Sequence, residues 1–129
     1  MELNVELVCL DLLSGKENTI ADGKGILSDR TLSYAEKENP HCMHRVTFSE
    51  EKIILKRSAE FSSETVLPVT GKGQAVVHSP YGDMVLDAVL EEFIREDDLW
   101  MAEYRIVSGD QTVTRQRLTW KLTKKGKCN

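Results

Sequence analysis

Residues 82–123 read GDMVLDAVLEEFIREDDLWMAEYRIVSGDQTVTRQRLTWKLT and carry the plainest structural signal in the chain. Along most of this stretch, apolar and polar residues alternate, which is the period of a strand whose two faces meet different surroundings. The segments 95–98 and 108–111 interrupt the alternation with charged residues and a glycine, as hairpin loops do. The stretch therefore predicts three consecutive antiparallel strands that share a buried face.

Parity along each strand predicts which side chains share that buried face. The strand at 83–94 contributes Met84, Leu86, Ala88, Leu90 and Ile94. The two following strands contribute Trp100, Ala102, Tyr104 and Ile106, then Leu118, Trp120 and Leu122. The run from Leu90 to Ile94 also fits a helical turn, and this alternative stays open.

The same two-residue period recurs upstream, where turn signals divide it. We expect further strands at about 3–13, 19–27, 31–37, 42–49, 52–58, 65–69 and 74–79, while residues 58–63 fit either a turn or a strand. A change of phase near Val8 indicates either a β-bulge in the first of these strands or a strand that is buried on both sides there. Ser79-Pro80-Tyr81-Gly82 is the clearest turn, because proline fixes φ and glycine accepts a positive φ.

These elements predict an all-β protein: an antiparallel up-and-down barrel of about eight to ten strands with no amphipathic helix. Barrel closure removes the exposed edges that an open sheet would leave, and a β-sandwich is the alternative. A length of 129 residues suits a single β-barrel domain over residues 1–129. We expect the basic residues at 124–129 to form a flexible tail.

Composition argues against several classes of partner. The net charge of −4 would repel the negatively charged phosphate backbone of DNA or RNA, so no nucleic-acid partner is expected. No apolar run reaches the roughly 20 residues of a membrane helix, and the acidic start Met1–Glu6 does not read as a secretory signal. The lack of such a run also leads us to expect no membrane partner. Cys9, Cys42 and Cys128 are odd in number and irregularly spaced, which predicts reduced thiols in a cytoplasmic protein.

Four features occur in an order and spacing shared with a known family. They are Gly25 ahead of a strand–turn–strand, the Lys-Arg pair that closes Ile53–Arg57, the turn Ser79–Gly82 before a long alternating strand, and the final hairpin. On these residues, the chain from Val5 to Leu122 resembles the YwiB-like family of uncharacterised bacterial proteins. The resemblance implies a lipocalin-like (calycin-type) β-barrel in a bacterial, cytoplasmic protein. It implies no activity and no catalytic residues.

Arg57 is the most informative single residue, because parity places it with Leu55 on the inner face. A guanidinium needs an acceptor there. It would either anchor an anion or carboxylate of a ligand, or pair with backbone carbonyls or an internal carboxylate such as Asp11 or Glu103, and we favour the internal pair. The family tends to carry a glycine shortly after the matching arginine, whereas this chain has Ser58-Ala59-Glu60, so the local turn is expected to differ.

The segment His41-Cys42-Met43-His44 contains metal-ligand residue types, but a zinc site needs three or four converging groups. On a strand, Cys42 and His44 share one face and His41 points away. His78 and Cys9 are the remaining candidates, and both are distant in the chain. We therefore predict no metal and no cofactor.

Interior aromatic residues point to a binding role. Trp100, Tyr104 and Trp120 are predicted to line the barrel interior, where aromatic rings either bind an apolar ligand or fill the core. Arg57 would supply a polar anchor beside them. The leading interpretation is a non-enzymatic barrel, monomer or homodimer, that binds a small apolar or amphipathic molecule.

Two rival interpretations stay open. The first is a protein-interaction or structural module with a filled core and no ligand. The second is an enzyme, which ranks last because the chain holds no nucleophile elbow, phosphate loop or Cys-His relay. Catalysis would need polar groups that converge at one barrel mouth, and His44, Arg57 and Tyr81 are the candidates. His44 and Tyr81 therefore complete the predicted site.

Overall fold

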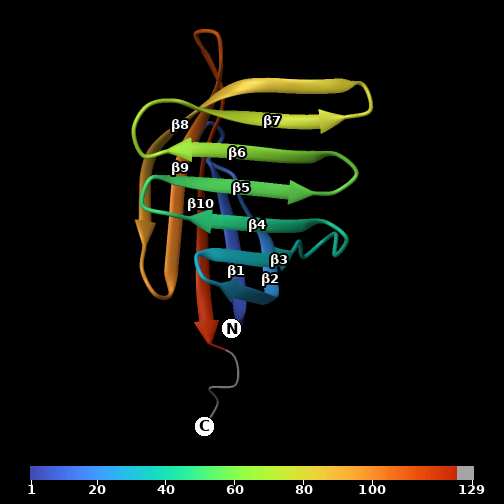
Figure 1. Cartoon of the computed structure of the whole chain (residues 1–129), viewed down its shortest axis with the longest axis vertical. Helices are drawn as coiled ribbons and strands as arrows, with labels where there is room; N and C mark the ends of the chain where they lie inside the picture. Colours follow the sequence, from blue (N-terminus) through green and yellow to red (C-terminus); the bar gives the residue numbers. More distant parts are fainter. Residues whose placement is uncertain (125–129) are drawn as a thin grey trace.

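A closed barrel of ten antiparallel strands forms from residues 1–124, which are the residues that this computed structural model describes (Figure 1). Each strand pairs with its neighbours in sequence, and β1 also pairs with β10, which closes the ring. The predicted up-and-down barrel is confirmed, and the sandwich alternative is wrong because pairing continues around the whole ring. The strands are β1 (Glu2–Asp11), β2 (Glu17–Ser28), β3 (Thr31–Ala35), β4 (Met43–Phe48), β5 (Lys52–Ser58), β6 (Ser62–Pro68), β7 (Gly73–Ser79), β8 (Gly82–Arg95), β9 (Leu99–Ser108) and β10 (Gln111–Lys124).

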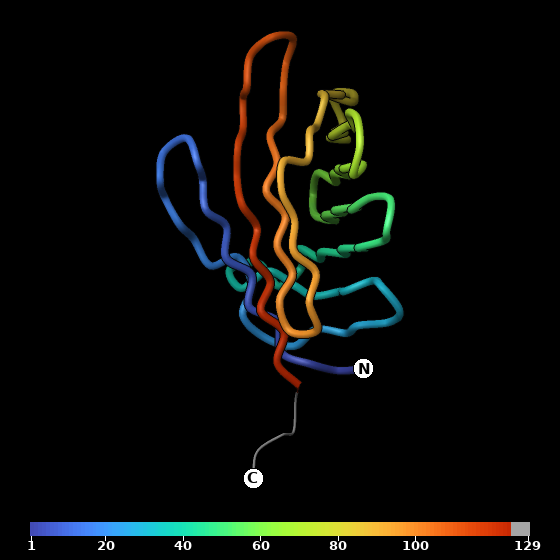
Figure 2. The backbone as a smooth tube through the Cα atoms, turned by 90° about the vertical axis from the view of Figure 1, so that its left-hand side faces the viewer, coloured from blue at the N-terminus to red at the C-terminus, as the bar shows by residue number. Residues whose placement is uncertain are grey.

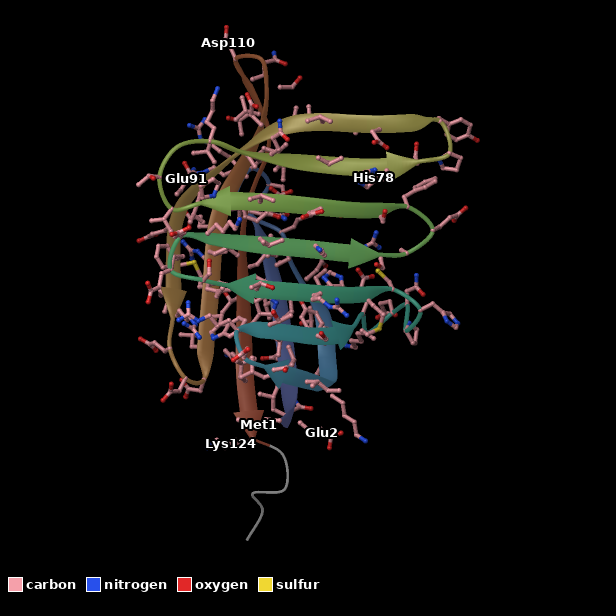
Figure 3. All side chains as sticks on the ribbon, viewed as in Figure 1. Met1, Glu2, His78, Glu91, Asp110 and Lys124 are labelled. Carbon is pink, nitrogen blue, oxygen red and sulfur yellow. The ribbon has the colours of Figure 1, made fainter. Side chains whose placement is uncertain are left out.

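The strands run in two directions. In Figure 1, β3 to β7 cross the view, while β1, β9 and β10 run along the long axis behind them. Strand β8 starts beside β7 and ends beside β9, so it connects the two sets. Figure 2 shows the β9–β10 hairpin extending past the stacked strands, and Figure 3 marks its tip at Asp110 and places Met1 and Lys124 together at the other end.

Shifts of register mark the predicted and unpredicted irregularities. In the β1–β2 pairing the register shifts between Leu7 and Val8, where a bulge in the first strand was one of two alternatives. The unpaired residue is Ile20 of β2, and β1 pairs with β10 without interruption, so the bulge belongs to β2. A second shift, between Leu90 and Glu92, lies where a helical turn was the alternative, and the chain stays extended, so that alternative is wrong. Because this bulge changes the parity by one, Ile94 is opposite Met101 and does not share the inner face predicted for it.

Two turns connect strands where the sequence left a choice open in one case and predicted a turn in the other. Residues 58–63 contain a turn, since β5 ends at Ser58 and β6 begins at Ser62. In the turn from Ser79 to Gly82, the Ser79 hydroxyl donates to the carbonyl of Gly82 at 2.9 Å and accepts from the N–H of Tyr81 at 3.2 Å. Gly82 has a φ of 119°, which confirms the need for glycine at this position.

Inward-facing side chains of the strands form one hydrophobic core. Phe48 lies 4.7 Å from Trp100 between ring centroids and meets Trp120 edge-on at 5.8 Å. Gly25 lies so close to β1 that a Cβ at this position would overlap Cγ2 of Val5. Met84 was predicted to be in the core but is exposed at the end of β8 near the β7–β8 turn. Further fully buried side chains are Leu7, Leu32, Val46, Ile53 and Leu67.

None of the described residues belongs to a helix long and apolar enough to cross a membrane. The basic tail predicted for residues 124–129 lies outside the described residues except for Lys124, and so does Cys128.

Candidate functional site

The barrel interior contains a cavity of about 310 Å³. Its wall has an apolar part and a polar part, so the cavity offers two kinds of surface side by side. The apolar part is formed by Leu7, Ile20, Val46, Leu55, Leu118 and Trp120. The polar part is formed by Cys9, Tyr34, Glu36, His44, Arg57, Ser63, Thr65, Tyr104 and Gln116, together with the exposed Lys56.

A second hollow, of about 630 Å³, lies beside Met1, Leu27 and Lys124. Among the described residues, its lining includes no aromatic side chain, histidine or cysteine. Binding sites are recognised by apolar surface combined with a few converging polar groups. The smaller, interior cavity is therefore the better candidate site.

Strand register places a row of side chains across four neighbouring strands of the cavity wall. Tyr34 on β3 is opposite His44 on β4, His44 is opposite Arg57 on β5, and Arg57 is opposite Ser63 on β6. Directly opposite residues point to the same face of a sheet, and all four line the cavity. The rings of Tyr34 and His44 stack with centroids 5.1 Å apart.

Glu36 follows the end of β3 and holds this row together from one side. Its Oε2 accepts a hydrogen bond from Arg57 Nε at 2.8 Å and lies 2.7 Å from His44 Nε2. The thiol of Cys42 is a third hydrogen-bond partner. The backbone also joins the two ends of the loop, because the N–H of Glu36 donates to the carbonyl of Cys42 at 3.0 Å. We call Glu36, Cys42, His44 and Arg57 the Glu36 cluster.

Burial and hydrogen bonding oppose each other in the Glu36 cluster. Burial by itself would raise the pKa of Glu36, but hydrogen bonds from Arg57, His44 and Cys42 prevail and lower it to about 2. Burial lowers the pKa of His44, and the adjacent Glu36 offsets only part of this effect. Burial, aided by Glu36, raises the pKa of the Cys42 thiol to about 11. At neutral pH the cluster therefore holds an ionised Glu36, a neutral His44 that donates its Nε2 hydrogen to Glu36, and a protonated Cys42.

A second set of polar contacts lines the cavity on β1, β9 and β10. Gln116 Nε2 donates to the hydroxyl of Tyr104 at 2.5 Å, and the Cys9 thiol donates to Gln116 Oε1 at 3.4 Å. Burial raises the pKa of Tyr104 to about 12. Trp120 Nε1 donates to the hydroxyl of Tyr34 at 2.7 Å, which links this side of the cavity to the row on β3 to β6. Both phenol oxygens therefore accept a hydrogen bond from the protein.

The structure brings together four of the six predicted site residues. Arg57, His44, Tyr104 and Trp120 all line the cavity. Trp100 is buried against Phe48, with the guanidinium of Arg95 5.9 Å from the centroid of its ring, and it does not line the cavity. Tyr81 is 94% exposed in the β7–β8 turn. His44, Arg57 and Tyr81 therefore do not converge as the enzyme interpretation required.

The internal partner of Arg57 differs from the two that the sequence suggested. Arg57 pairs with Glu36, whereas Asp11 Oδ1 accepts from the N–H of Leu13 at 2.8 Å and Glu103 pairs with Arg117 at 2.8 Å. The prediction of an internal ion pair is thus correct, and the named partners are wrong. Parity alone could have suggested Glu36, because it follows Tyr34 by two residues and a strand was expected to reach residue 37.

The remaining candidate metal ligands are separated as parity suggested. His41 is exposed, while Cys42 is fully buried and His44 is partly buried. His78 lies on β7 (Figure 3). Its Nδ1 is 2.8 Å from Asp83 Oδ1. The sequence treated Cys42 and His44 as a pair with no third ligand, and it missed that Glu36 stands beside both.

No protein-family model and no curated protein sequence matches the chain. Among solved structures, the barrel is similar to the crystal structure of ywiB protein from Bacillus subtilis, with a TM-score of 0.55 and 12% sequence identity. The similarity covers 93% of this chain and 89% of that one. At this identity the comparison shows a shared fold, and the resemblance to YwiB is supported at that level.

Proposed function

We propose that this barrel binds a small amphipathic molecule in its interior cavity and does not transform it. The observation that carries the proposal is the division of one cavity of about 310 Å³ into an apolar wall and a polar row. Small-molecule sites commonly span roughly 300–1,000 Å³ and combine apolar lining with a few placed polar groups. A cavity at the lower end of that range favours a compact ligand.

The apolar wall would hold the body of the ligand. Ile20, Leu55 and Leu118 are partly buried and provide apolar surface to the cavity, behind which Trp120 and Leu7 are fully buried. Apolar contact removed from water contributes roughly 25 cal/mol per Å². An aromatic or branched aliphatic group placed against Leu55 and Leu118 would remove apolar surface from water.

The polar row would bind a carboxylate or carbonyl of the ligand. Arg57 uses Nε for Glu36 and lines the cavity with a side chain that is 43% exposed, so its other guanidinium N–H groups would be available to a ligand. The indole of Trp120 is a donor only, so the Tyr34 oxygen accepts and its own hydrogen is directed elsewhere. The Tyr104 oxygen likewise accepts a hydrogen bond, from Gln116 Nε2, so its own hydrogen is not used in that contact. Arg57, Tyr34 and Tyr104, which lie on three different strands and line the cavity, would supply the donors to an acceptor of the ligand.

The alternative, a structural or protein-interaction module with a filled core, fits less well because the core leaves a cavity lined by polar donors. The proposal also assigns the protein to a reducing compartment, the bacterial cytoplasm. Cys9 and Cys42 are both free thiols, which is the usual state of cysteine there.

Native mass spectrometry is the direct test. Protein purified gently from a bacterial host should carry an extra mass that disappears on denaturation. A titration with 8-anilinonaphthalene-1-sulfonate, an amphipathic anion, should show saturable binding with energy transfer from tryptophan. Filling the cavity with Thr65→Phe should abolish this binding while the protein still unfolds cooperatively.

A matched pair of variants tests the role of Arg57. Arg57→Ala should weaken sulfonate binding about tenfold, which corresponds to about 1.4 kcal/mol. Arg45→Ala removes the same charge from an exposed position on the adjacent strand and should leave binding unchanged. Equal affinities for both variants, with a lowered melting temperature for Arg57→Ala, would show that Arg57 only stabilises the fold.

A further inference from the structure

Three side chains of the Glu36 cluster offer three different metal-ligand atoms. The thiol sulfur of Cys42, the imidazole nitrogen of His44 and a carboxylate oxygen of Glu36 all lie within 4.8 Å of one another. Nitrogen and oxygen ligands of a tetrahedral zinc ion, bound at about 2.0–2.1 Å, are roughly 3.3 Å apart. Small side-chain rotations are therefore enough to bring the three atoms onto one ion.

The local structure already holds the three residues in place. The loop between Glu36 and Cys42 is closed by two backbone hydrogen bonds, from Glu36 N–H to Cys42 O at 3.0 Å and from Cys42 N–H to Asn39 O at 2.9 Å. His44 is oriented by its stacking against Tyr34. Cys42 is fully buried, so its thiol has little freedom to move away. An ordered ligand set reduces the entropy that metal binding would otherwise cost.

We infer that Glu36, Cys42 and His44 bind a divalent transition metal, for which Zn²⁺ is the best match. A thiolate and an imidazole select zinc and its neighbours over Mg²⁺ and Ca²⁺, which take oxygen ligands. On binding, Cys42 releases its proton to solvent. His44 loses its Nε2 hydrogen to solvent and takes up a proton at Nδ1, so the imidazole stays neutral and Nε2 is free to bind the ion. The charges of the thiolate and the carboxylate then balance the charge of the ion.

The neighbouring residues suit such a site. Arg57 Nε holds Glu36 Oε2 at 2.8 Å, as outer partners of metal-bound carboxylates commonly do. Glu36 and His44 also line the cavity, so a fourth coordination position would face its interior. Three protein ligands with one open position are typical of zinc sites that bind an exchangeable group. The sequence predicted no metal because it counted only two converging ligands. The inference does not depend on the organic ligand proposed above.

Cobalt titration of the full chain tests the site. Reduced, chelator-treated protein should bind one Co²⁺ and develop a thiolate-to-cobalt charge-transfer band, which Zn²⁺ should remove by displacement and Mg²⁺ should not. Zn²⁺ should also raise the melting temperature. Cys42→Ser should abolish the band. The matched controls Cys9→Ser and Cys128→Ser should keep it, and far-UV circular dichroism should confirm that each variant is folded.

A second pair of variants separates the metal site from a simple hydrogen-bonded cluster. Glu36→Gln and His44→Gln should each weaken Co²⁺ binding at least about tenfold. A wild-type protein that binds Co²⁺ without the charge-transfer band, or does not bind it, overturns the inference whatever the variants do. A band that persists in folded Cys42→Ser also overturns it.

Discussion

Trp120 and Tyr34, which are 86 residues apart in the chain, are joined inside the barrel by a hydrogen bond of 2.7 Å from the indole Nε1 to the phenol oxygen. Strands β1 and β2 lie between β10 and β3 in the ring, so the bond spans the interior and does not follow strand pairing. Both side chains are buried. The bond therefore satisfies a donor that water cannot reach and fixes one wall of the cavity relative to another.

Removing the phenol hydroxyl of Tyr34 should destabilise the folded protein. Tyr34→Phe leaves the indole N–H of Trp120 buried without an acceptor, and we expect the free energy of unfolding to fall by about 1–3 kcal/mol. Urea denaturation at pH 7 measures it. Tyr81→Phe, which removes the same atom from a side chain that is 94% exposed, should change stability by less than about 0.5 kcal/mol. Equal effects of the two variants would contradict the importance of this bond.

Acid should destabilise the protein in two stages. Burial lowers the pKa of His44 in the folded state, so stability should decline once the pH falls below about 6.5, the ordinary value. The pKa of Glu36 is lowered from 4.5 to about 2, so its contribution is fully present above pH 4.5 and is lost as the pH falls toward 2. Urea denaturation at several pH values should show both declines.

The variant Glu36→Gln isolates the second stage. The glutamine cannot ionise, so the free energy of unfolding of this variant should be lower than that of wild type by on the order of 2 kcal/mol at pH 7. This difference should shrink between pH 4.5 and pH 3. Glu50→Gln, at a carboxylate that is 86% exposed and 3.9 Å from Arg30, should follow the wild-type curve. A deficit for Glu36→Gln that does not change with pH would show that the carboxylate charge has no special role.

Two glycines of β2 should respond differently to the same substitution. Gly25→Ala would place a Cβ against Cγ2 of Val5 and near the carbonyl of Ser33, whereas a Cβ at Gly23 meets nothing within 4 Å. We expect Gly25→Ala to lower the free energy of unfolding by about 1–3 kcal/mol. Gly23→Ala should be neutral or slightly stabilising, because alanine reduces the entropy of the unfolded chain. Thermal denaturation compares them, and a more harmful Gly23→Ala would contradict the packing of β1 on β2.

Burial should also determine how much the ion pairs on β9 and β10 contribute to the free energy of unfolding. Glu103 has a side chain that is 9% exposed and accepts from Arg117 Nε at 2.9 Å, while Arg115 Nη2 lies 3.6 Å from its other oxygen. Glu103→Gln should cost about 1–2 kcal/mol, because a charged hydrogen bond in a shielded place is lost. Glu50→Gln should cost less than about 0.5 kcal/mol. Stability measured at low and high salt should show the smaller salt dependence for Glu103.

Much of the fold could be predicted because side chains on a strand alternate between two faces. The inner positions of Trp100, Tyr104 and Trp120 followed from parity and are buried as expected. The same rule failed at Ile94, because a bulge between Leu90 and Glu92 shifts the parity. The local pattern marked the place, because the run from Leu90 to Ile94 breaks the alternation, but it did not distinguish a helical turn from a bulge at Glu91.

The candidate site could be predicted only in part. Arg57 was recognised as an inner charge that needs an acceptor, and an ion pair was favoured. Glu36 was missed as its partner, although parity places it two residues after Tyr34 on the inner face, because the sequence does not show in which register β3, β4 and β5 lie side by side. The contacts of His44 with Tyr34 and with Glu36 have the same origin.

The sequence by itself determined an all-β chain, most of its strand limits and most inner faces, because these depend on alternation and on turn residues within a few positions. Only the tertiary structure decided that ten strands close between β1 and β10, that Tyr34, His44, Arg57 and Ser63 form one row, and that a cavity remains beside Trp120. These features depend on which residues of distant strands meet, and on the volumes that their side chains fill together.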